Sequence, residues 1–131
     1  MVGATIGGRP GEPGFAAYVD RFAGSPYIKG VRQVLHGGVP SSYWLSDVFV
    51  QGIRLLGEKD LHFDLCLRPI DIAEGAKLVD LCPETRFVLD HCGNGNVQSA
   101  DRTQWERDVA AMAQRENVIC KISGIVAGAK P

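Results

Sequence analysis

The sequence lacks the features that mark several broad classes of protein. No apolar run approaches the ~18 residues of a membrane span, and the first ten residues carry neither the basic region nor the apolar region of a secretory signal. The formal net charge is only −1, so no basic field favours nucleic acid and no acidic tail is present. These absences favour a cytoplasmic protein whose partners are neither membranes nor nucleic acids.

Cysteine and histidine are both scarce. The four cysteines, Cys66, Cys82, Cys92 and Cys120, form no C-x-x-C pair, and three of them lie in apolar, strand-like runs. We therefore expect buried, reduced thiols, and neither a disulfide framework nor a zinc knuckle. Of the three histidines, His91 directly precedes Cys92. Adjacent residues on a strand point to opposite faces, so this pair is not expected to share one metal.

Five short apolar runs alternate with four segments whose apolar residues recur at helical spacing. The expected strands span residues 2–6, 27–35, 62–67, 87–90 and 118–122. The expected helices span residues 15–22, 46–59, 71–81 and 102–115, with Ser46 able to cap the second. Strict alternation with strands roughly thirty residues apart predicts an α/β fold, a parallel β(αβ)4 sheet in one domain covering residues 1–131.

Polar residues follow most of the expected strands, where the loops of a parallel α/β fold form its site. They are His36, Arg68, His91 with Asn94, and Lys121 with Ser123. His91 ends the apolar run Phe87–Asp90, as a metal ligand or acid–base group would, but a buried histidine satisfied by the backbone fits the same pattern. Arginine and lysine at strand ends either bind a ligand or simply reach solvent.

The loop after the first expected strand is rich in glycine and proline. Its spacing is Gly8-x-x-Gly11-x-x-Gly14, which differs from the G-x-G-x-x-G of a dinucleotide site. Pro10 and Pro13 also remove two of the backbone donors that a phosphate would need. The loop is therefore a substrate loop or a plain connector, and not a nucleotide motif.

Two charged residues lie within apolar strands, Arg32 in the second and Asp64 in the third. Each is costly to bury unless it is paired. They either pair with each other or face an anionic ligand, and the internal ion pair is the better reading for Asp64. Because a guanidinium suits bidentate recognition of a carboxylate, Arg32 and Arg68 are the better ligand candidates.

The succession GVRQVLHGG, FDLCLRP, LVDLCPETRFVLDHCGN and NVICKISG resembles the amidohydrolase superfamily. The branch it resembles contains sugar-lactone and sulfomuconolactone hydrolases. The resemblance implies a (β/α)8 TIM barrel and hydrolysis of a lactone, or of a related ester or amide. It also implies a water activated by an aspartate and, in many members, by one divalent metal, usually zinc.

The resemblance also suggests roles for particular residues. His91 matches the histidine of the family's fifth strand, which ligates metal or contacts substrate. Arg32, His36 and Arg68 fall at strand ends where such lactonases hold substrate carboxylate or hydroxyl groups. His91 is thus the candidate catalytic and metal-binding residue, the other three are candidate substrate-binding residues, and the expected partner is a small lactone or carboxylate.

The departures from the family pattern concern its first and last strands. The first carries His-x-His, which is absent here, and the last carries a catalytic aspartate that nothing after CKISG supplies. We therefore expect strands two to six of the barrel, an incomplete barrel lacking the first and last strands. A zinc site needs about three protein ligands, and water activation needs a base. This polypeptide alone is not expected to hold zinc or to turn over, and a metal-independent variant remains an alternative.

Two other readings stay open. Some members of the superfamily are metal-dependent decarboxylases, which the motifs above do not exclude. The chain could also be a non-catalytic, truncated remnant that survives as an open sheet or as a dimer of half-barrels. The edges of the first and fifth strands would then be unpaired.

Overall fold

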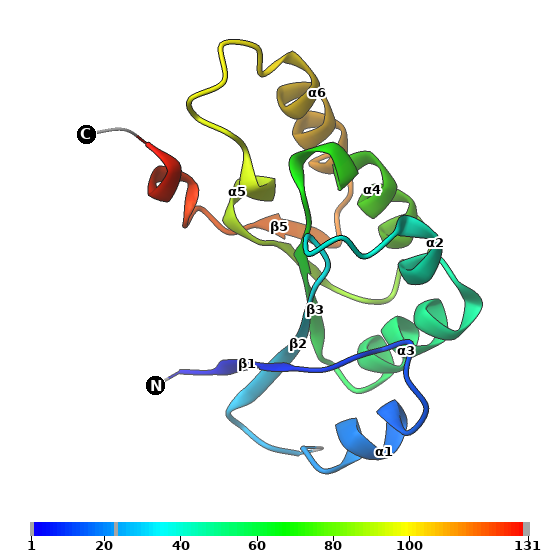
Figure 1. The fold of residues 1–131 in the computed structure, drawn as a ribbon. Helices are drawn as coiled ribbons and strands as arrows, with labels where there is room; N and C mark the ends of the chain where they lie inside the picture. Colours follow the sequence, from blue (N-terminus) through cyan, green and yellow to red (C-terminus); the bar gives the residue numbers. More distant parts are fainter. Residues whose placement is uncertain (1, 23, 130–131) are drawn as a thin grey trace.

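The computed structural model describes residues 2–22 and 24–129, which form one curved, parallel sheet with helices packed on one side (Figure 1). The strands lie in the order β1-β2-β3-β4-β5, the order in which they occur in the sequence. Each pair is parallel. The prediction of a parallel β(αβ)4 arrangement is confirmed.

The strands are β1 (Ala4–Gly7), β2 (Ile28–Val34), β3 (His62–Cys66), β4 (Phe87–Leu89) and β5 (Val118–Cys120). The helices are α1 (Phe15–Asp20), α2 (Ser41–Trp44), α3 (Asp47–Glu58), α4 (Ile72–Leu81), α5 (His91–Asn94) and α6 (Thr103–Met112). Two 3-10 turns, η1 (Pro69–Asp71) and η2 (Ile125–Gly128), complete the described elements. No helix in the described ranges is long and apolar enough to cross a membrane.

The helix-facing side of the sheet carries the core. Phe63 of β3 lies between two other aromatic rings, with centroid distances of 5.9 Å to Phe49 of α3 and 6.5 Å to Phe87 of β4. Val31 and Leu65 on the same face are fully buried. These side chains alternate along the strands with those of the other face, as the two-residue period of a strand requires.

The other face of the sheet is concave and carries charged and polar side chains. The strand register places Arg32 beside Asp64, Asp64 beside Val88, and Val88 beside Ile119. None of the described helices covers this face (Figure 1), and Ile119 is 67% exposed. The two faces of one sheet therefore meet very different surroundings.

The expected element boundaries agree with the observed ones to within a few residues, but the two four-residue helices α2 and α5 were missed. α2 follows Pro40, and the sequence analysis assigned nothing to this segment. Ser46 is the N-cap residue of α3, as expected, yet its hydroxyl makes no capping bond. It donates instead to Tyr43 O at 2.7 Å, which joins α2 to α3.

Two expectations about cysteine are wrong. Cys66 and Cys82 are buried thiols, whereas Cys92 is half-buried and Cys120 is exposed. Cys120 ends β5, which is the edge strand of the sheet. In addition, β4 ends at Leu89, so His91 and Cys92 do not lie on a strand and do not point to opposite faces of one.

Candidate active site

The turn after β4 is left-handed throughout. His91, Cys92, Gly93 and Asn94 all have positive φ, at 54°, 52°, 67° and 55°. For residues other than glycine this conformation costs about 1–2 kcal/mol each. Strain of this kind persists only where the surrounding structure enforces it, and it is concentrated at functional sites.

Hydrogen bonds from neighbouring elements hold this turn. Asn94 Nδ2 donates to Leu67 O at 2.7 Å, and Trp105 Nε1 of α6 donates to Cys92 O at 2.9 Å. The Cys92 amide donates to Lys121 O at 3.2 Å. The turn is therefore fixed to the segments that follow β3 and β5, on either side of it.

His91 is positioned by the segment after β5. Its Nδ1 shares a hydrogen bond of 2.9 Å with the Ser123 hydroxyl, and the tautomer decides which of the two donates. Gly124 lies so close that a Cβ there would be 2.7 Å from the same nitrogen. The described residues offer Nε2 no hydrogen bond, so this side of the ring is free to contact a ligand.

Asp90, directly before the turn, is a fully buried carboxylate between two cations. Its Oδ2 lies 3.4 Å from Arg32 Nη1 and its Oδ1 lies 3.3 Å from Lys121 Nζ. The Asp90 side chain is 0% exposed, whereas those of Arg32 and Lys121 are 42% and 47% exposed. Two cations and one anion leave one positive charge in excess, which suits a carboxylate or a developing oxyanion.

Asp64 has a different partner from the one considered in the sequence analysis. Arg32 pairs with Asp90, and Asp64 Oδ1 instead lies 3.1 Å from His62 Nε2. The orientation is too poor for a hydrogen bond, so this buried oxygen has none. The same His62 nitrogen lies 3.1 Å from Thr5 Oγ1. A proton relay needs both ring nitrogens, so this trio is not a Ser-His-Asp-type triad.

Arg68 and His36 stand apart from the ion cluster that Asp90 forms with Arg32 and Lys121. Arg68 donates two hydrogen bonds to the Asp71 carboxylate, at 2.6 and 2.9 Å, and these raise the pKa of Arg68. His36 is exposed, and its backbone amide donates to Cys66 O at 3.1 Å. No hydrogen bond or ion pair links either side chain to Arg32, Asp90 or His91 within the described residues.

Cys66 lies on the concave face close to Asp90. Burial is the main cause that raises the pKa of its thiol, and the negative charge of Asp90 raises this pKa further. A thiol of this kind stays protonated near neutral pH, and the thiolate is the form that attacks substrates or binds metals. The raised pKa disfavours Cys66 as a nucleophile, and its burial suits a packing role.

The described residues do not fit a zinc site by themselves. They contain no group of three histidine, cysteine, aspartate or glutamate side chains able to hold a metal. His91 contributes one ligand nitrogen at most on its free side, and Asp90 is occupied by Arg32 and Lys121. Two cations beside the nearest carboxylate would oppose a divalent ion there.

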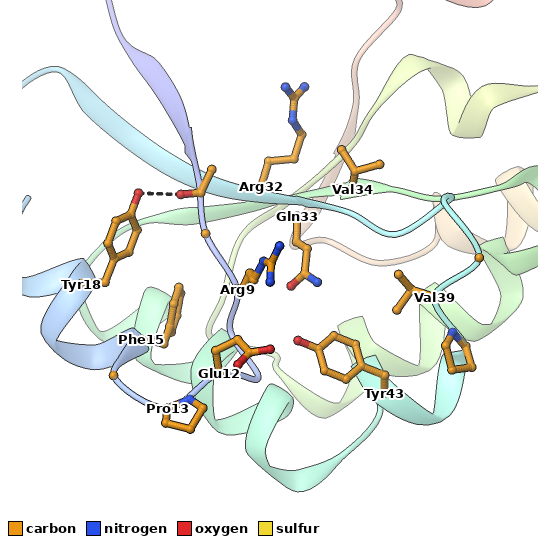
Figure 2. A pocket seen from close by; sticks show the side chains of 15 residues that line it. Arg9, Glu12, Pro13, Phe15, Tyr18, Arg32, Gln33, Val34, Val39 and Tyr43 are labelled. Carbon is orange, nitrogen blue, oxygen red and sulfur yellow. Dashed lines mark hydrogen bonds between the residues drawn. The ribbon is translucent and has the colours of Figure 1, made fainter.

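A cleft of about 1090 Å³ opens beside the cluster, between the β1–α1 loop and α2 (Figure 2). Arg32 and Val34 of β2 line it, so it continues onto the concave face. Gly7 of β1 and Gln33 of β2 also line it. The remaining lining residues come from the loops and helices after these strands: Gly8, Arg9, Glu12, Pro13, Gly14, Phe15, Tyr18, Gly38, Val39, Pro40 and Tyr43. The Gly-rich loop is thus part of a cleft wall.

Sequence reasoning missed several of these residues. Asp90 was assigned to a strand, and only the register of β4 with β3 and β5 reveals its two cationic partners. Arg9 and Glu12 lie in the loop interpreted as a substrate loop or a plain connector, without a role for either residue, and Tyr43 lies on α2, which was missed. Lys121 was named among the polar residues that follow the expected strands, but it was assigned no role.

Comparisons with known proteins agree with this picture. The profile of the amidohydrolase family matches residues 1–130. An L-fucono-1,5-lactonase from Burkholderia ambifaria is 27% identical over 116 residues, which cover 88% of this chain and 40% of that protein. The uncharacterized protein y4mH from Sinorhizobium fredii is 31% identical over 78 residues, which cover 60% and 26%.

Solved structures show the same fold. An amidohydrolase from Burkholderia multivorans with bound zinc superposes with a TM-score of 0.89 at 20% identity, covering 98% of this chain and 46% of that one. Amidohydrolase 2 from Bifidobacterium longum subsp. infantis gives a TM-score of 0.60 at 28% identity, covering 83% and 50%. The five strands thus correspond to part of an amidohydrolase TIM barrel, and the chain spans less than half the length of the curated relatives it matches.

The family match extends over almost the whole chain, and the fold agrees with it. The chain belongs to the amidohydrolase family.

Proposed function

We propose that this chain forms the substrate-binding part of a hydrolase site that opens a lactone. The observation that carries the proposal is the cluster of Arg32, Asp90 and Lys121, which lies next to His91 at the carboxyl ends of three parallel strands. The similarity to an L-fucono-1,5-lactonase supports a lactone as the substrate. Family membership supports hydrolysis as the reaction.

The proposed roles follow from charge and geometry. When water attacks a lactone carbonyl, negative charge develops on the carbonyl oxygen, and donors placed in advance around it lower the barrier. Arg32 and Lys121 are half-exposed and share one buried counter-ion, so they can stabilise this charge or hold a substrate carboxylate. His91, oriented through Ser123, contacts the reacting group or a metal through its free Nε2.

The candidate substrate-binding residues differ in how free they are. Arg32 is the strongest, because its half-exposed side chain belongs to the ion cluster with Asp90 and the residue also lines the cleft. Arg68 is weaker, because its guanidinium is engaged by Asp71. His36 is exposed and makes no side-chain hydrogen bond within the described residues, so it can reach a ligand only at the rim.

Water activation requires a group that the described residues do not provide. Asp90 is held by two cations, and no three-ligand metal site exists among these residues. No step through a metal is therefore assigned to them. We expect this polypeptide alone to bind a lactone without hydrolysing it.

The test is to measure lactone binding and turnover separately. Purified chain of verified intact mass would be titrated with L-fucono-1,5-lactone by ligand-observed NMR, and acid release would be followed with a pH indicator. We expect saturable binding, no acid release above the buffer rate, and about tenfold weaker binding in Arg32→Met, since charge-assisted contacts are worth about 1.5–3 kcal/mol.

Arg86→Met is the matched control, because Arg86 lies at the opposite end of β4 and pairs with Asp60. Failure of the unaltered chain to bind any lactone would refute the proposal. Acid release above background would refute the statement that water activation needs other groups. Carbon dioxide release from a carboxylate substrate would instead assign the site to a decarboxylase.

A further inference from the structure

We propose that the cleft between the β1–α1 loop and α2 binds the hydroxyl groups of an uncharged, sugar-like ligand. The proposal rests on the proposed function, since it names the class of lactone that the site would take. It assigns Arg9, Glu12 and Tyr43 as the residues that contact these hydroxyl groups.

The walls of the cleft combine rings with fixed backbone. Phe15 and Tyr18 of α1 line one side, and Tyr43 of α2 lines the other (Figure 2). The Tyr18 hydroxyl donates to Gly7 O at 2.6 Å, which ties α1 to the end of β1. A volume of about 1090 Å³ is slightly above the range typical of small-molecule sites, so a compact ring fits within it.

Arg9 differs from the other arginines of the chain. Within the described residues each of the other eight makes an ion pair, a hydrogen bond or a ring contact, as in the pairs Arg32–Asp90 and Arg115–Asp80. Arg9 makes none of these with the described residues. The carboxylate of Glu12 and the hydroxyl of Tyr43 likewise have no hydrogen-bond partner among them.

These unpaired groups face the same space. Figure 2 shows the side chains of Arg9, Glu12 and Tyr43 directed into the cleft from the loop and from α2. The Glu12 amide donates to Arg9 O at 3.0 Å, so a tight turn fixes the two residues relative to each other. Pro10 packs against Gly52 of α3, where no room remains for a Cβ, which holds the loop against the helix layer.

The mixture of charges selects an uncharged ligand. Glu12 would repel a carboxylate that approached Arg9, and Arg9 would repel an ammonium group that approached Glu12. A hydroxyl group can donate to the Glu12 carboxylate and accept from the Arg9 guanidinium. Several hydroxyl groups on one compact ring therefore satisfy both residues, and the aromatic walls offer apolar contact to its C–H groups.

A series of sugars that differ only in charge tests this directly. D-Galactose, D-galacturonate and D-galactosamine share one skeleton and are neutral, anionic and cationic near pH 6. Binding to the ¹⁵N-labelled chain would be followed by amide chemical shifts. We expect galactose to shift the amides of the non-proline residues in 8–15 and 38–43 and to bind at least about threefold more tightly than either charged analogue.

The variants Arg9→Gln and Glu12→Gln together should weaken galactose binding about tenfold. Both side chains are exposed and unpaired, so the midpoint of urea unfolding should not change. Glu116→Gln is the matched control, because Glu116 is exposed and lies before β5, in the loop at the opposite end of the strands. It should leave binding unchanged.

Tighter binding of galacturonate or galactosamine than of galactose would overturn the proposal, as would unchanged galactose binding in the double variant. The lactone titration separates this inference from the proposed function. If lactone binding depends on Arg32 but not on Arg9 and Glu12, the cleft assignment fails and the lactone site stands. If galactose binds through Arg9 and Glu12 but no lactone binds, the proposed function fails and the sugar site stands.

Discussion

The two faces of the five-stranded sheet are built from the same strands but from opposite kinds of side chain. On the helix-covered face, Phe63 and Leu65 of β3 are fully buried among aromatic and aliphatic neighbours. On the concave face, the intervening Asp64 contacts a histidine, and Arg32 and Lys121 are paired with a buried carboxylate. Because successive residues of a strand point to opposite faces, the five residues of β3 supply both core side chains and the polar side chains of the concave face.

The two faces of the sheet should respond differently to substitution. Apolar packing is dense and nearly independent of pH and salt, so loss of a ring there removes stability directly. The concave face depends on ion pairs. The contribution of an ion pair to stability changes with its exposure, and the cost of breaking it depends on which partner is left without a counter-ion. Substitutions matched across the two faces should therefore differ in size and in their response to solution conditions.

The largest effect is expected for Phe63→Ala, which removes the central ring of the helix-covered face. Phe63 packs edge-on against both Phe49 and Phe87, and truncation should lower the free energy of unfolding by about 3–5 kcal/mol. Urea denaturation followed by far-UV circular dichroism measures this. Val34→Ala on the concave face, where Val34 is 49% exposed, is the control and should cost less than about 1 kcal/mol. Equal losses would show that both faces are packed alike.

The helix-covered face was also the part that the sequence predicted best. Its apolar residues recur every second position in strands and every three or four in helices, so the five strands and the four main helices could be located to within a few residues. α2 was missed because four residues contain too little periodicity to be recognised.

The concave face was predictable only in part. Position at a strand end was enough to select His91 and Lys121 as polar candidates, and a charge inside an apolar strand selected Arg32. The partner of Arg32 was not predictable, because it depends on side-chain direction across three strands and not on sequence spacing. The left-handed turn at His91 was missed because its conformation is imposed by hydrogen bonds from distant residues, such as Asn94 to Leu67.

The second effect compares the two ways of breaking the ion cluster. Replacing both cations, Arg32→Met with Lys121→Met, leaves the Asp90 carboxylate buried with neither of its charged partners, and should cost about 2–3 kcal/mol. Asp90→Asn leaves two half-exposed cations that water can solvate, and should cost less. Urea denaturation of both variants at pH 7 gives the comparison. A larger loss for Asp90→Asn would show that the carboxylate has stabilising partners other than these cations.

The third effect concerns a close approach on the concave face. The ring of His62 lies directly against Gly30 of the neighbouring strand, leaving no room for a Cβ there. Gly30→Ala should displace the ring and its contacts to Asp64 and Thr5, lowering the free energy of unfolding by about 1–3 kcal/mol. Gly37→Ala is the control, because a Cβ at Gly37 would meet nothing within 4 Å. Equal stability of the two variants would show that the His62 ring moves aside without penalty.

The smallest effect comes from an ion pair on the outer surface, between Asp80 of α4 and Arg115 after α6. Arg115 donates to both Asp80 oxygens, at 2.8 and 2.7 Å, and these hydrogen bonds lower the pKa of Asp80 below its usual value. Because the pKa is lower in the folded than in the unfolded state, the pair stabilises the fold above about pH 4, and this contribution is lost as the pH falls through the folded-state pKa.

Asp80 is mostly exposed, so Asp80→Asn should cost less than about 1 kcal/mol at pH 7. The cost should disappear in acid and in about 1 M salt, because salt screens exposed charges strongly. Urea denaturation at pH 7 and pH 3, with and without salt, measures both responses. The loss caused by replacing Arg32 and Lys121 should survive the same salt, because Asp90 is buried. If salt abolished both losses equally, the ion cluster of the concave face would be as solvated as the outer surface, and its proposed role as a charge-stabilising site would fail with it.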